Sequence, residues 1–232
     1  MTPTDELFNQ YAGNYDAVLG SALSATGEDV SFYAQNRVAF LAGLLRRMNE
    51  TPVSALDFGC GVGTATDYLL QCFDLKRLAG VDVSEDSIQS ASLQFANDRV
   101  SFFEIRNYLP DASFDLVYCN GVFHHIPVAQ RAESLRYIYE SLRPGGIFAL
   151  WENNPWNPGT RYVMDRCEFD RDANTLSPPA AKRMVRQAGF ESIRTDFLFI
   201  FPRALRGLRS IEALLTRWPI GGQYQLLLRK PS

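Results

Sequence analysis

The fold of this chain is decided by one stretch, Ala55-Leu56-Asp57-Phe58-Gly59-Cys60-Gly61-Val62-Gly63-Thr64. A short apolar run, residues 53–58, ends in glycines at alternate positions, and a helix-compatible segment follows at 64–72. This order predicts a β-strand, a tight turn and the start of an α-helix. Glycine allows a backbone with positive φ and lets a ligand approach the main chain closely. Because the amide groups at the N-terminus of the helix then face that ligand, the stretch predicts a nucleotide-type cofactor site.

Strands and helices alternate after residue 53, which is typical of a parallel sheet with helices on both faces. We expect strands at 53–58, 78–83, 100–105, 114–119 and 147–151, and helices at 62–72, 84–95 and 129–142. A stretch without clear period follows. The remaining elements are expected to be a helix at 177–188, a strand at 193–201, a basic amphipathic helix within 203–218 and a last strand at 223–228.

We interpret residues 1–232 as one α/β domain. Its parts are a helical N-terminal cap at 1–50, a cofactor-binding core at 51–152, a substrate-side loop at 153–176 and a C-terminal region at 177–232 with the last helices and two strands. A content of 46% hydrophobic and 21% charged residues is that of a soluble globular protein. The first ten residues lack an apolar core, and the 4 cysteines form no C-x-x-C pair. These features predict no secretory signal, no transmembrane segment and a cytoplasmic location.

Glycine spacing alone does not identify the cofactor. Dinucleotide-binding turns prefer G-x-G-x-x-G, with an acid at the end of the second strand for the ribose. Here the spacing is G-x-G-x-G, with Asp57 before the first glycine and Asp82 at the end of the second expected strand. Asp57 would repel a pyrophosphate and attract an ammonium group. The turn therefore indicates a phosphate-free cofactor with a cationic end, and S-adenosylmethionine fits this description.

Companion motifs support that choice. They are Leu56-Asp57-Phe58-Gly59-Cys60-Gly61-Val62-Gly63, Gly80-Val81-Asp82-Val83-Ser84, Ser113-Phe114-Asp115-Leu116-Val117, Phe123-His124-His125-Ile126-Pro127 and Leu142-Arg143-Pro144-Gly145-Gly146. In these motifs, between about residues 50 and 152, the chain resembles the class I S-adenosylmethionine-dependent methyltransferases of the type 11 (UbiE/ubiquinone-like) group. The resemblance implies a Rossmann-like seven-stranded sheet of order 3-2-1-4-5-7-6, with strand 7 antiparallel and helices on both faces.

The resemblance also implies roles in binding the cofactor. Gly59 and Gly61 would let the backbone approach the methionine part, and Asp57 would help to hold its amino group. Asp82 is an acceptor only when ionised, so it suits a bidentate contact with the two ribose hydroxyls. Val83 would lie against the face of the adenine ring.

Four further cofactor contacts are predicted from position. Asn120 stands where the backbone of the family contacts the methionine part. The family often has an aspartate after the third strand for the adenine amino group, but the matching position here is near Arg106, which accepts no hydrogen bond. We therefore place this contact at Asn107. Tyr15 and Arg37 lie in the leader, where a tyrosine or arginine of the relatives often closes over the cofactor carboxylate; helix packing is the alternative role for both.

Candidate catalytic groups follow the fourth and fifth strands. Methyl transfer is an in-line displacement, so the protein aligns the acceptor and removes its proton where needed. His124 and His125 are the only 2 histidines of the chain. They are expected at the sheet edge where ligands of open α/β sheets bind, and His125 is the favoured base. Glu152 is an alternative base, and a purely structural role of the histidines stays open.

No metal site is expected. Some quinone O-methyltransferases of the resembled group hold a metal with an E-x-x-E-H motif. The matching residues here are Gly121-Val122-Phe123-His124-His125, which include no carboxylate.

We predict S-adenosylmethionine-dependent methyl transfer to a small-molecule acceptor, with O-methylation favoured because a histidine base suits a hydroxyl. A dinucleotide-dependent oxidoreductase and a non-catalytic cofactor-binding module of the same fold are the alternatives. The net charge of −3 argues against a general affinity for nucleic acid. The basic residues of 201–232 leave open a peripheral contact with an anionic lipid or a phosphate-bearing acceptor.

Overall fold

A computed structural model describes residues 15–168, 170 and 173–232. Its centre is a seven-stranded sheet of order β3-β2-β1-β4-β5-β7-β6. The strands are β1 (Ser54–Phe58), β2 (Arg77–Asp82), β3 (Val100–Glu104), β4 (Phe114–Asn120), β5 (Leu142–Asn153), β6 (Glu191–Leu198) and β7 (Gln223–Arg229). β7 runs antiparallel to both of its neighbours, and the other pairs are parallel. The predicted order and the predicted antiparallel strand are confirmed.

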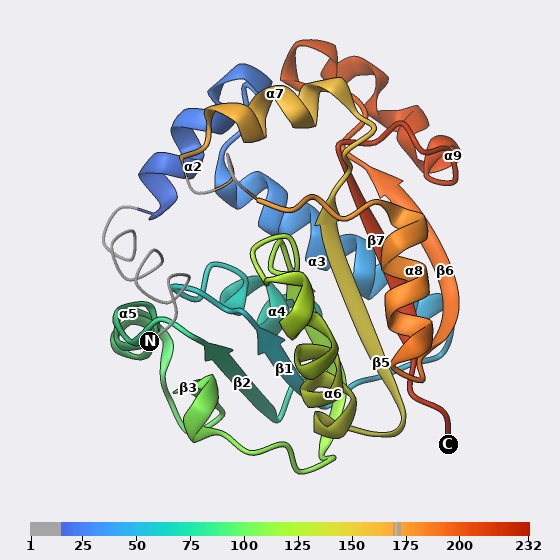
Figure 1. Ribbon diagram of the computed structural model, residues 1–232. Helices are drawn as coiled ribbons and strands as arrows, with labels where there is room; N and C mark the ends of the chain where they lie inside the picture. The colour runs from blue at the N-terminus through green and yellow to red at the C-terminus, as the bar shows by residue number, and fades with distance from the viewer. Residues whose placement is uncertain (1–14, 169, 171–172) are drawn as a thin grey trace.

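Helices cover both faces of the sheet (Figure 1). One face packs against α3 (Val30–Arg47), α4 (Thr66–Cys72) and α5 (Glu85–Phe95), and the other packs against α6 (Arg131–Ser141) and α8 (Pro178–Gln187). Strand alternation divides the core between these two layers: Leu116 and Tyr118 of β4 point to the first, and Val117 and Cys119 to the second. The chain is therefore a three-layer α/β/α domain.

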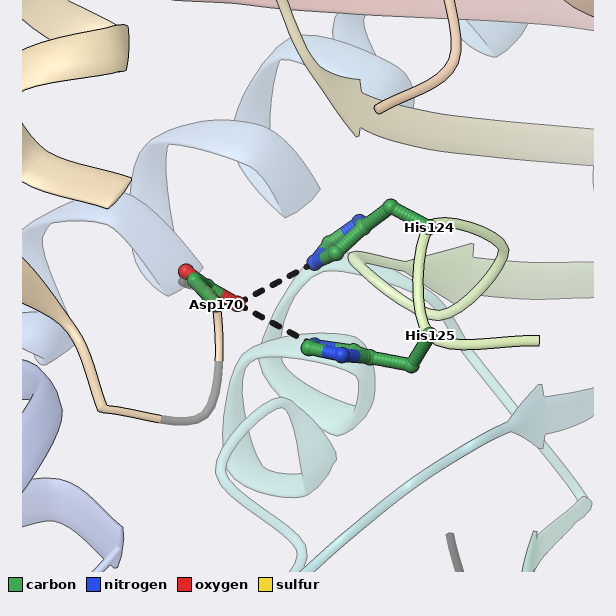
Figure 2. A group of neighbouring side chains, drawn as sticks. All are labelled: His124, His125 and Asp170. Atoms are coloured by element: carbon green, nitrogen blue, oxygen red, sulfur yellow. Dashed lines mark hydrogen bonds and ion pairs between the residues drawn. The ribbon is translucent and has the colours of Figure 1, made fainter. Parts of the chain in front are cut away.

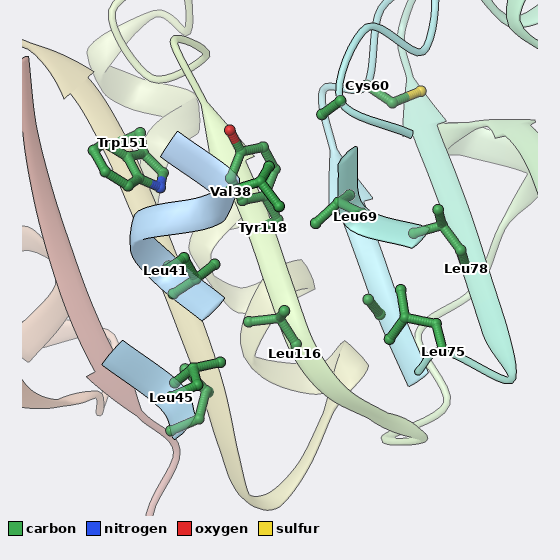
Figure 3. Close-up of a cluster of buried hydrophobic side chains, with 14 of the residues drawn as sticks. Val38, Leu41, Leu45, Cys60, Leu69, Leu75, Leu78, Leu116, Tyr118 and Trp151 are labelled. Carbon is green, nitrogen blue, oxygen red and sulfur yellow. The ribbon is translucent and has the colours of Figure 1, made fainter. Parts of the chain in front are cut away.

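Buried leucines join α3 and α4 to the sheet (Figure 3). Leu41 and Leu45 of α3 and Leu69 of α4 are at most 1% exposed, as is Leu116 of β4 beneath them. Truncation of such a leucine to alanine costs about 2–5 kcal/mol, because the lost contacts leave a cavity. This packing makes α3 a layer of the core. It differs from our expectation that residues 1–50 form a cap, although α2 (Tyr15–Leu23) and the first turns of α3 do line the cleft at the carboxyl ends of the strands.

Local signals set the helix starts as expected. The side chain of Asp29 accepts a hydrogen bond from the backbone amide of Phe32 and caps α3, and Ser84 accepts from Ser87 and caps α5. Glu85 and Asp86 lie in the first turn of α5, where negative charge is favourable. The cap at Ser84 matters for the site, because it fixes the chain directly after Asp82.

Two regions differ from the sequence-based expectations. The stretch 153–176, expected to be a loop, contains the helix α7 (Pro158–Arg166), which begins with Asn157 as its cap and Pro158 in its first turn. The expected basic amphipathic helix within 203–218 is a 3₁₀ helix, η4 (Arg203–Ile211), followed by the short α9 (Glu212–Leu215). Leu205 departs from helical dihedrals, and Gly207 in the same segment disfavours an α-helix. Contact of this segment with a lipid stays a prediction.

Three short 3₁₀ helices complete the described structure: η1 (Ser24–Thr26), η2 (Ile105–Asn107) and η3 (Val128–Gln130). Within the described ranges, no helix has both the length and the apolar character needed to cross a membrane. α2 contacts α7, and η4 and α9 lie near them beyond the carboxyl ends of the parallel strands (Figure 1). Ligands of open α/β sheets bind at this edge.

Candidate functional site

The glycine turn after β1 has the geometry predicted for it. Gly59 and Gly61 have φ values of +73° and +52°, in the left-handed region that favours glycine. A Cβ atom on Gly59 would lie 2.3 Å from the side chain of Val122, whereas a Cβ atom on Gly61 would meet nothing within 4 Å. Gly59 therefore permits close packing of the turn, and Gly61 leaves open space in front of the backbone.

Asp82 holds this turn in place. Its Oδ2 atom accepts a hydrogen bond of 2.8 Å from the amide of Gly61, and its Oδ1 atom accepts one of 2.9 Å from the amide of Ser84. Each oxygen of an ionised carboxylate can accept more than one hydrogen bond. The carboxylate thus ties the turn to the end of β2 while it faces the cavity described next.

A cavity of about 270 Å³ opens in front of the turn. Its lining includes five of the predicted cofactor residues, namely Gly59, Gly61, Asp82, Val83 and Asn120. Asn107 is exposed and does not line it; Ile105 occupies this side instead, because the short segment after β3 turns Asn107 outward. Ser87, Gln130 and Ser134 also line the cavity and were not predicted. They come from helices that only the tertiary fold brings to the site.

Asp57 and Arg37 are buried and do not line the first cavity. They are 5% and 6% exposed. Burial, and then the negative charge of Asp82, raise the pKa of Asp57 from 3.8 to about 7, while Arg37 acts in the opposite direction. Arg37 donates hydrogen bonds to the hydroxyl of Tyr118 at 3.3 Å and to Oε1 of Gln223 at 3.0 Å. The site therefore offers one acid that is easily protonated and one cation bonded to neutral oxygens.

Tyr15 is the first residue of α2. Its side chain lies outside the described residues, so its predicted contact with the cofactor stays a prediction.

A second cavity, of about 400 Å³, lies on the other side of the loop after β4. It is formed by α2, α3, α7 and the segment that leads into η4 and α9. Much of its lining is apolar or aromatic, including Leu23, Phe32, Tyr33, Met164 and Phe201. Its charged lining residues are Arg37, His124, Asp170, Arg209 and Glu212.

The two cavities share a wall. Asn120, Gly121 and His125 line both of them. Gly121 has φ +68° and its amide donates to the carbonyl of Trp151 at 2.9 Å, which turns the chain sharply out of β4. A group bound in the first cavity can therefore meet a group bound in the second only at this wall. That is the place where a transferred group would have to pass.

His124 lies at this wall between the carboxylates of Glu152 and Asp170, the second of which is drawn in Figure 2. Its Nδ1 atom is 2.6 Å from Oε2 of Glu152, and its Nε2 atom is 3.3 Å from Oδ1 of Asp170. Nε2 of His125 is 3.2 Å from the same oxygen of Asp170. The other oxygen of Glu152 accepts a bond of 2.8 Å from the amide of Phe123. The three predicted catalytic residues are thus brought together, with Asp170 as an added member.

The two carboxylates raise the pKa of His124, whereas burial lowers it. Burial alone would lower the pKa of His124, but the charge of Glu152 and the bonds to both acids raise it to about 10. Burial, and then the charge of His124, lower the pKa of His125. The pKa of Asp170 lies well below its usual range, because bonds to both histidines outweigh the effect of its burial. His124 is therefore a cation at neutral pH and His125 is neutral.

Asp170 was not singled out in the sequence. It lies 46 positions after His124 in a stretch without periodicity. The signal that could have located its neighbourhood is Asn157-Pro158, a helix start that places α7, and hence Asp170 soon after its end, next to the cleft.

Comparison with known proteins agrees with this geometry. Residues 56–148 match a family model described as a methyltransferase domain. Within this range the chain is similar to the class I S-adenosylmethionine-dependent methyltransferases that the motifs indicated. The matched range runs from β1 into β5, so it includes the glycine turn, Asp82 and the wall shared by the two cavities. The class predicted from the motifs is confirmed.

Curated relatives of this chain include trans-aconitate 2-methyltransferases. The protein from Azoarcus sp. (strain BH72) is 29% identical over 119 residues, which are 51% of this chain and 46% of that protein. The protein from Sinorhizobium medicae (strain WSM419) is 28% identical over 142 residues, 60% of this chain and 54% of that protein. The chain thus spans about half the length of the curated relatives it matches.

Solved structures share the whole fold at lower identity. A possible histamine N-methyltransferase from Thermotoga maritima has a TM-score of 0.67 and 17% identity, covering 98% of this chain and 99% of that one. A putative methyltransferase of Haloferax volcanii, solved with a methyltransferase activator, has a TM-score of 0.66 and 21% identity, covering 97% and 98%. These similarities establish the fold.

Proposed function

We propose that this protein transfers the methyl group of S-adenosylmethionine to an oxygen atom of a small-molecule acceptor. One observation carries the proposal: the cavity lined by the cofactor residues and the second, largely apolar cavity meet at Asn120, Gly121 and His125. An in-line displacement needs donor and acceptor on opposite sides of a single point of contact, and this wall provides it.

The first cavity has the groups that S-adenosylmethionine requires. Asp82 faces it with acceptor capacity for the ribose hydroxyls, and Val83 offers an apolar surface to the adenine ring. The open space in front of Gly61 suits the methionine part. Asp57 carries the charge that an ammonium group attracts, and Arg37, which lines the second cavity, carries the charge that a carboxylate attracts.

The charges of the second cavity favour an acceptor with little charge. Arg209 is already paired with Glu28 at 2.8 Å, and Glu212 accepts from the amide of Phe201. His124 and Asp170 are paired with each other. This leaves Arg37, which lines this cavity and donates to Tyr118 and Gln223; its contact with the cofactor carboxylate stays a prediction. A tricarboxylate such as trans-aconitate would therefore find few cations, so we propose a largely apolar acceptor with one reacting oxygen.

The oxygen of the acceptor would lie against His125 at the shared wall. Removal of its proton by His125, with His124 or Glu152 as the alternative base, stays a prediction from the sequence. The relatives that carry the name trans-aconitate 2-methyltransferase are consistent with a small acceptor.

Transfer of a labelled methyl group tests this proposal. The protein is incubated with methyl-labelled S-adenosylmethionine and fractionated small-molecule extract, and mass spectrometry identifies the labelled product. We expect label on an oxygen of an apolar acceptor, with trans-aconitate as a weak acceptor in a parallel assay. Efficient formation of a trans-aconitate methyl ester would contradict the proposed acceptor class, and label on nitrogen or carbon would contradict O-methylation.

A further inference from the structure

Three side chains that bind metals in other proteins converge at the wall of the acceptor cavity (Figure 2). Nε2 of His124 and Nε2 of His125 lie 3.3 Å and 3.2 Å from one oxygen, Oδ1 of Asp170. One ligand atom from each of the three lies within 4.8 Å of the others. We propose that His124, His125 and Asp170 form a binding site for one divalent transition-metal ion.

The spacing of these atoms fits a metal site. A zinc-like ion lies about 2.0–2.2 Å from nitrogen and oxygen ligands, which places neighbouring ligand atoms about 3.0–3.4 Å apart in tetrahedral or octahedral geometry. The two separations from Asp170, 3.3 Å and 3.2 Å, fall in this interval. A cation bound beside Oδ1 would take the place of the protons between that oxygen and the two imidazoles, so only small side-chain movements are needed.

Glu152 supplies the outer contact that metal-binding histidines usually have. Its Oε2 atom lies 2.6 Å from Nδ1 of His124, which fixes the ring so that Nε2 points to Asp170. A carboxylate on the far nitrogen of a histidine ligand orients the ring and increases its basicity. Glu152 is itself held by the amide of Phe123 and is 1% exposed, so this orientation is rigid.

Asp170 is also held in position. Its amide donates to the carbonyl of Cys167 at 3.1 Å, at the end of α7. Farther along the chain, the amide of Asn174 donates to the carbonyl of His124 at 3.0 Å, and Arg131 bonds the carbonyl of Asn174 at 2.9 Å. The segment that carries the carboxylate is thus joined directly to the segment that carries the histidines.

The ligand set indicates the class of metal. Two imidazoles and one carboxylate suit zinc, iron(II), cobalt(II) or manganese(II), whereas magnesium and calcium prefer oxygen ligands alone. Three protein ligands leave coordination positions for another molecule, as in catalytic sites. All three ligands line the acceptor cavity, so these positions are reached from the space that we assign to the acceptor.

This site goes beyond the proposed function and gives the histidines a different part from the one predicted. A bound metal would hold the reacting oxygen of the acceptor and stabilise its negative charge as a Lewis acid. His125 would then serve as a ligand. The sequence concealed the site because the carboxylate is not part of the E-x-x-E-H pattern and comes from the turn after α7.

Metal titration of the protein alone tests the inference. Zn²⁺ binding is measured by calorimetry and Co²⁺ binding by visible absorption, on tag-free protein without cofactor or acceptor. We expect one ion per chain and a loss of affinity of at least tenfold in Asp170→Asn. Asp165→Asn makes the same chemical change at an exposed position in α7 and should bind as the parent does. Absence of stoichiometric binding, or equal binding by Asp170→Asn, would overturn the proposal.

Two further measurements guard against loss of folding in the variants. His125→Gln removes a ligand at the rim and should weaken binding to the same extent, with its melting temperature recorded beside it. In the parent protein, nitrogen NMR of its 2 histidines should show zinc on Nε2 of both rings. Unchanged imidazole signals at saturating zinc would sink the idea. Neither the metal titration nor the NMR measurement uses S-adenosylmethionine. A negative result in both would therefore contradict the metal site and leave the proposed methyl transfer untouched.

Discussion

The two cavities that meet at Asn120, Gly121 and His125 are built in different ways. The cofactor cavity is formed mainly by the ends of adjacent parallel strands and the turns that follow them, with Gly59 directly after β1 and with Asp82 and Asn120 as the last residues of β2 and β4. The acceptor cavity is assembled from α2, α3, α7, the turn at Asp170 and the segment before α9. One cavity depends on local backbone geometry, and the other depends on contacts between distant segments.

This difference determines which substitutions each cavity tolerates. The sheet is held by backbone hydrogen bonds and a core buried on both faces, so side chains at strand ends have little freedom. The lining of the acceptor cavity is tied by single side-chain bonds, such as Asn154 to Gly221 at 2.8 Å and Thr160 to Gly222 at 2.7 Å. We infer that substitutions in the first cavity abolish binding or folding, whereas substitutions in the second shift acceptor preference.

The sharpest test of this rigidity is the pair Gly59→Ala and Gly61→Ala. At Gly59 the added Cβ would lie 2.3 Å from Val122 in a backbone with φ +73°. Left-handed strain and overpacking together should cost about 2–5 kcal/mol of unfolding free energy. At Gly61 the Cβ points into open space, so only the strain of about 1–2 kcal/mol applies. Denaturant unfolding measures both. Equal losses would show that Val122 does not confine the turn.

The second prediction concerns Asp82→Asn. The amide keeps the size of the carboxylate, but it loses the charge and one acceptor oxygen. Charge-assisted hydrogen bonds contribute about 1.5–3 kcal/mol, so affinity for S-adenosylmethionine should fall about 10–150-fold. Calorimetry measures the change, with Asp98→Asn, exposed at the far end of β3, as the matched control. Unchanged affinity in Asp82→Asn would remove the ribose assignment.

The cofactor half could be predicted from the sequence because its determinants are contiguous. Gly59, Asp82 and Asn120 each lie at the carboxyl end of a strand, and an apolar run in the sequence predicts each of these strands. Parallel strands bring such residues to the same edge of the sheet. The predicted contact of Asn107 with the adenine ring is not supported by the lining of the cavity. The segment after β3 contains the short helix η2, which leaves Asn107 exposed.

The acceptor half could not be predicted in the same way. Asp170 meets His124 across 46 positions, and no spacing rule joins them. η4 has the apolar stripe of an amphipathic α-helix, yet it is 3₁₀ and kinked at Leu205. The stripe is only partly covered, with Leu205 and Leu208 at 48% and 45% exposure. The conformation of these segments depends on tertiary contacts, which a local sequence pattern does not predict.

A smaller effect is expected from Thr160→Val in α7. The variant keeps the shape of the side chain and loses its bond to the carbonyl of Gly222. Loss of one such bond is worth about 1 kcal/mol, so KM for the acceptor should rise about fivefold. Calorimetry with S-adenosylmethionine serves as the internal control and should give an unchanged Kd. A change in Kd without a change in KM would contradict the separation of the two cavities.

The smallest predicted effect is the pH dependence of cofactor affinity. With the pKa of Asp57 raised to about 7 in the free protein, its carboxyl is partly protonated at neutral pH. The ammonium of the cofactor favours the ionised form, so binding releases a proton and weakens as the pH falls. Affinity should be about threefold lower at pH 6.5 than at pH 7.5. Asp57→Asn should remove this dependence, and a stronger affinity at low pH in the parent would have the wrong sign.

The central claim is that the rigid cavity binds a phosphate-free cofactor with a cationic end. Parallel calorimetric titrations with S-adenosylmethionine and with NADH test it most directly. We predict saturable 1:1 binding of S-adenosylmethionine and no measurable heat from NADH. Binding of NADH alone would contradict the account, because Asp57 beneath the glycine turn should repel its pyrophosphate.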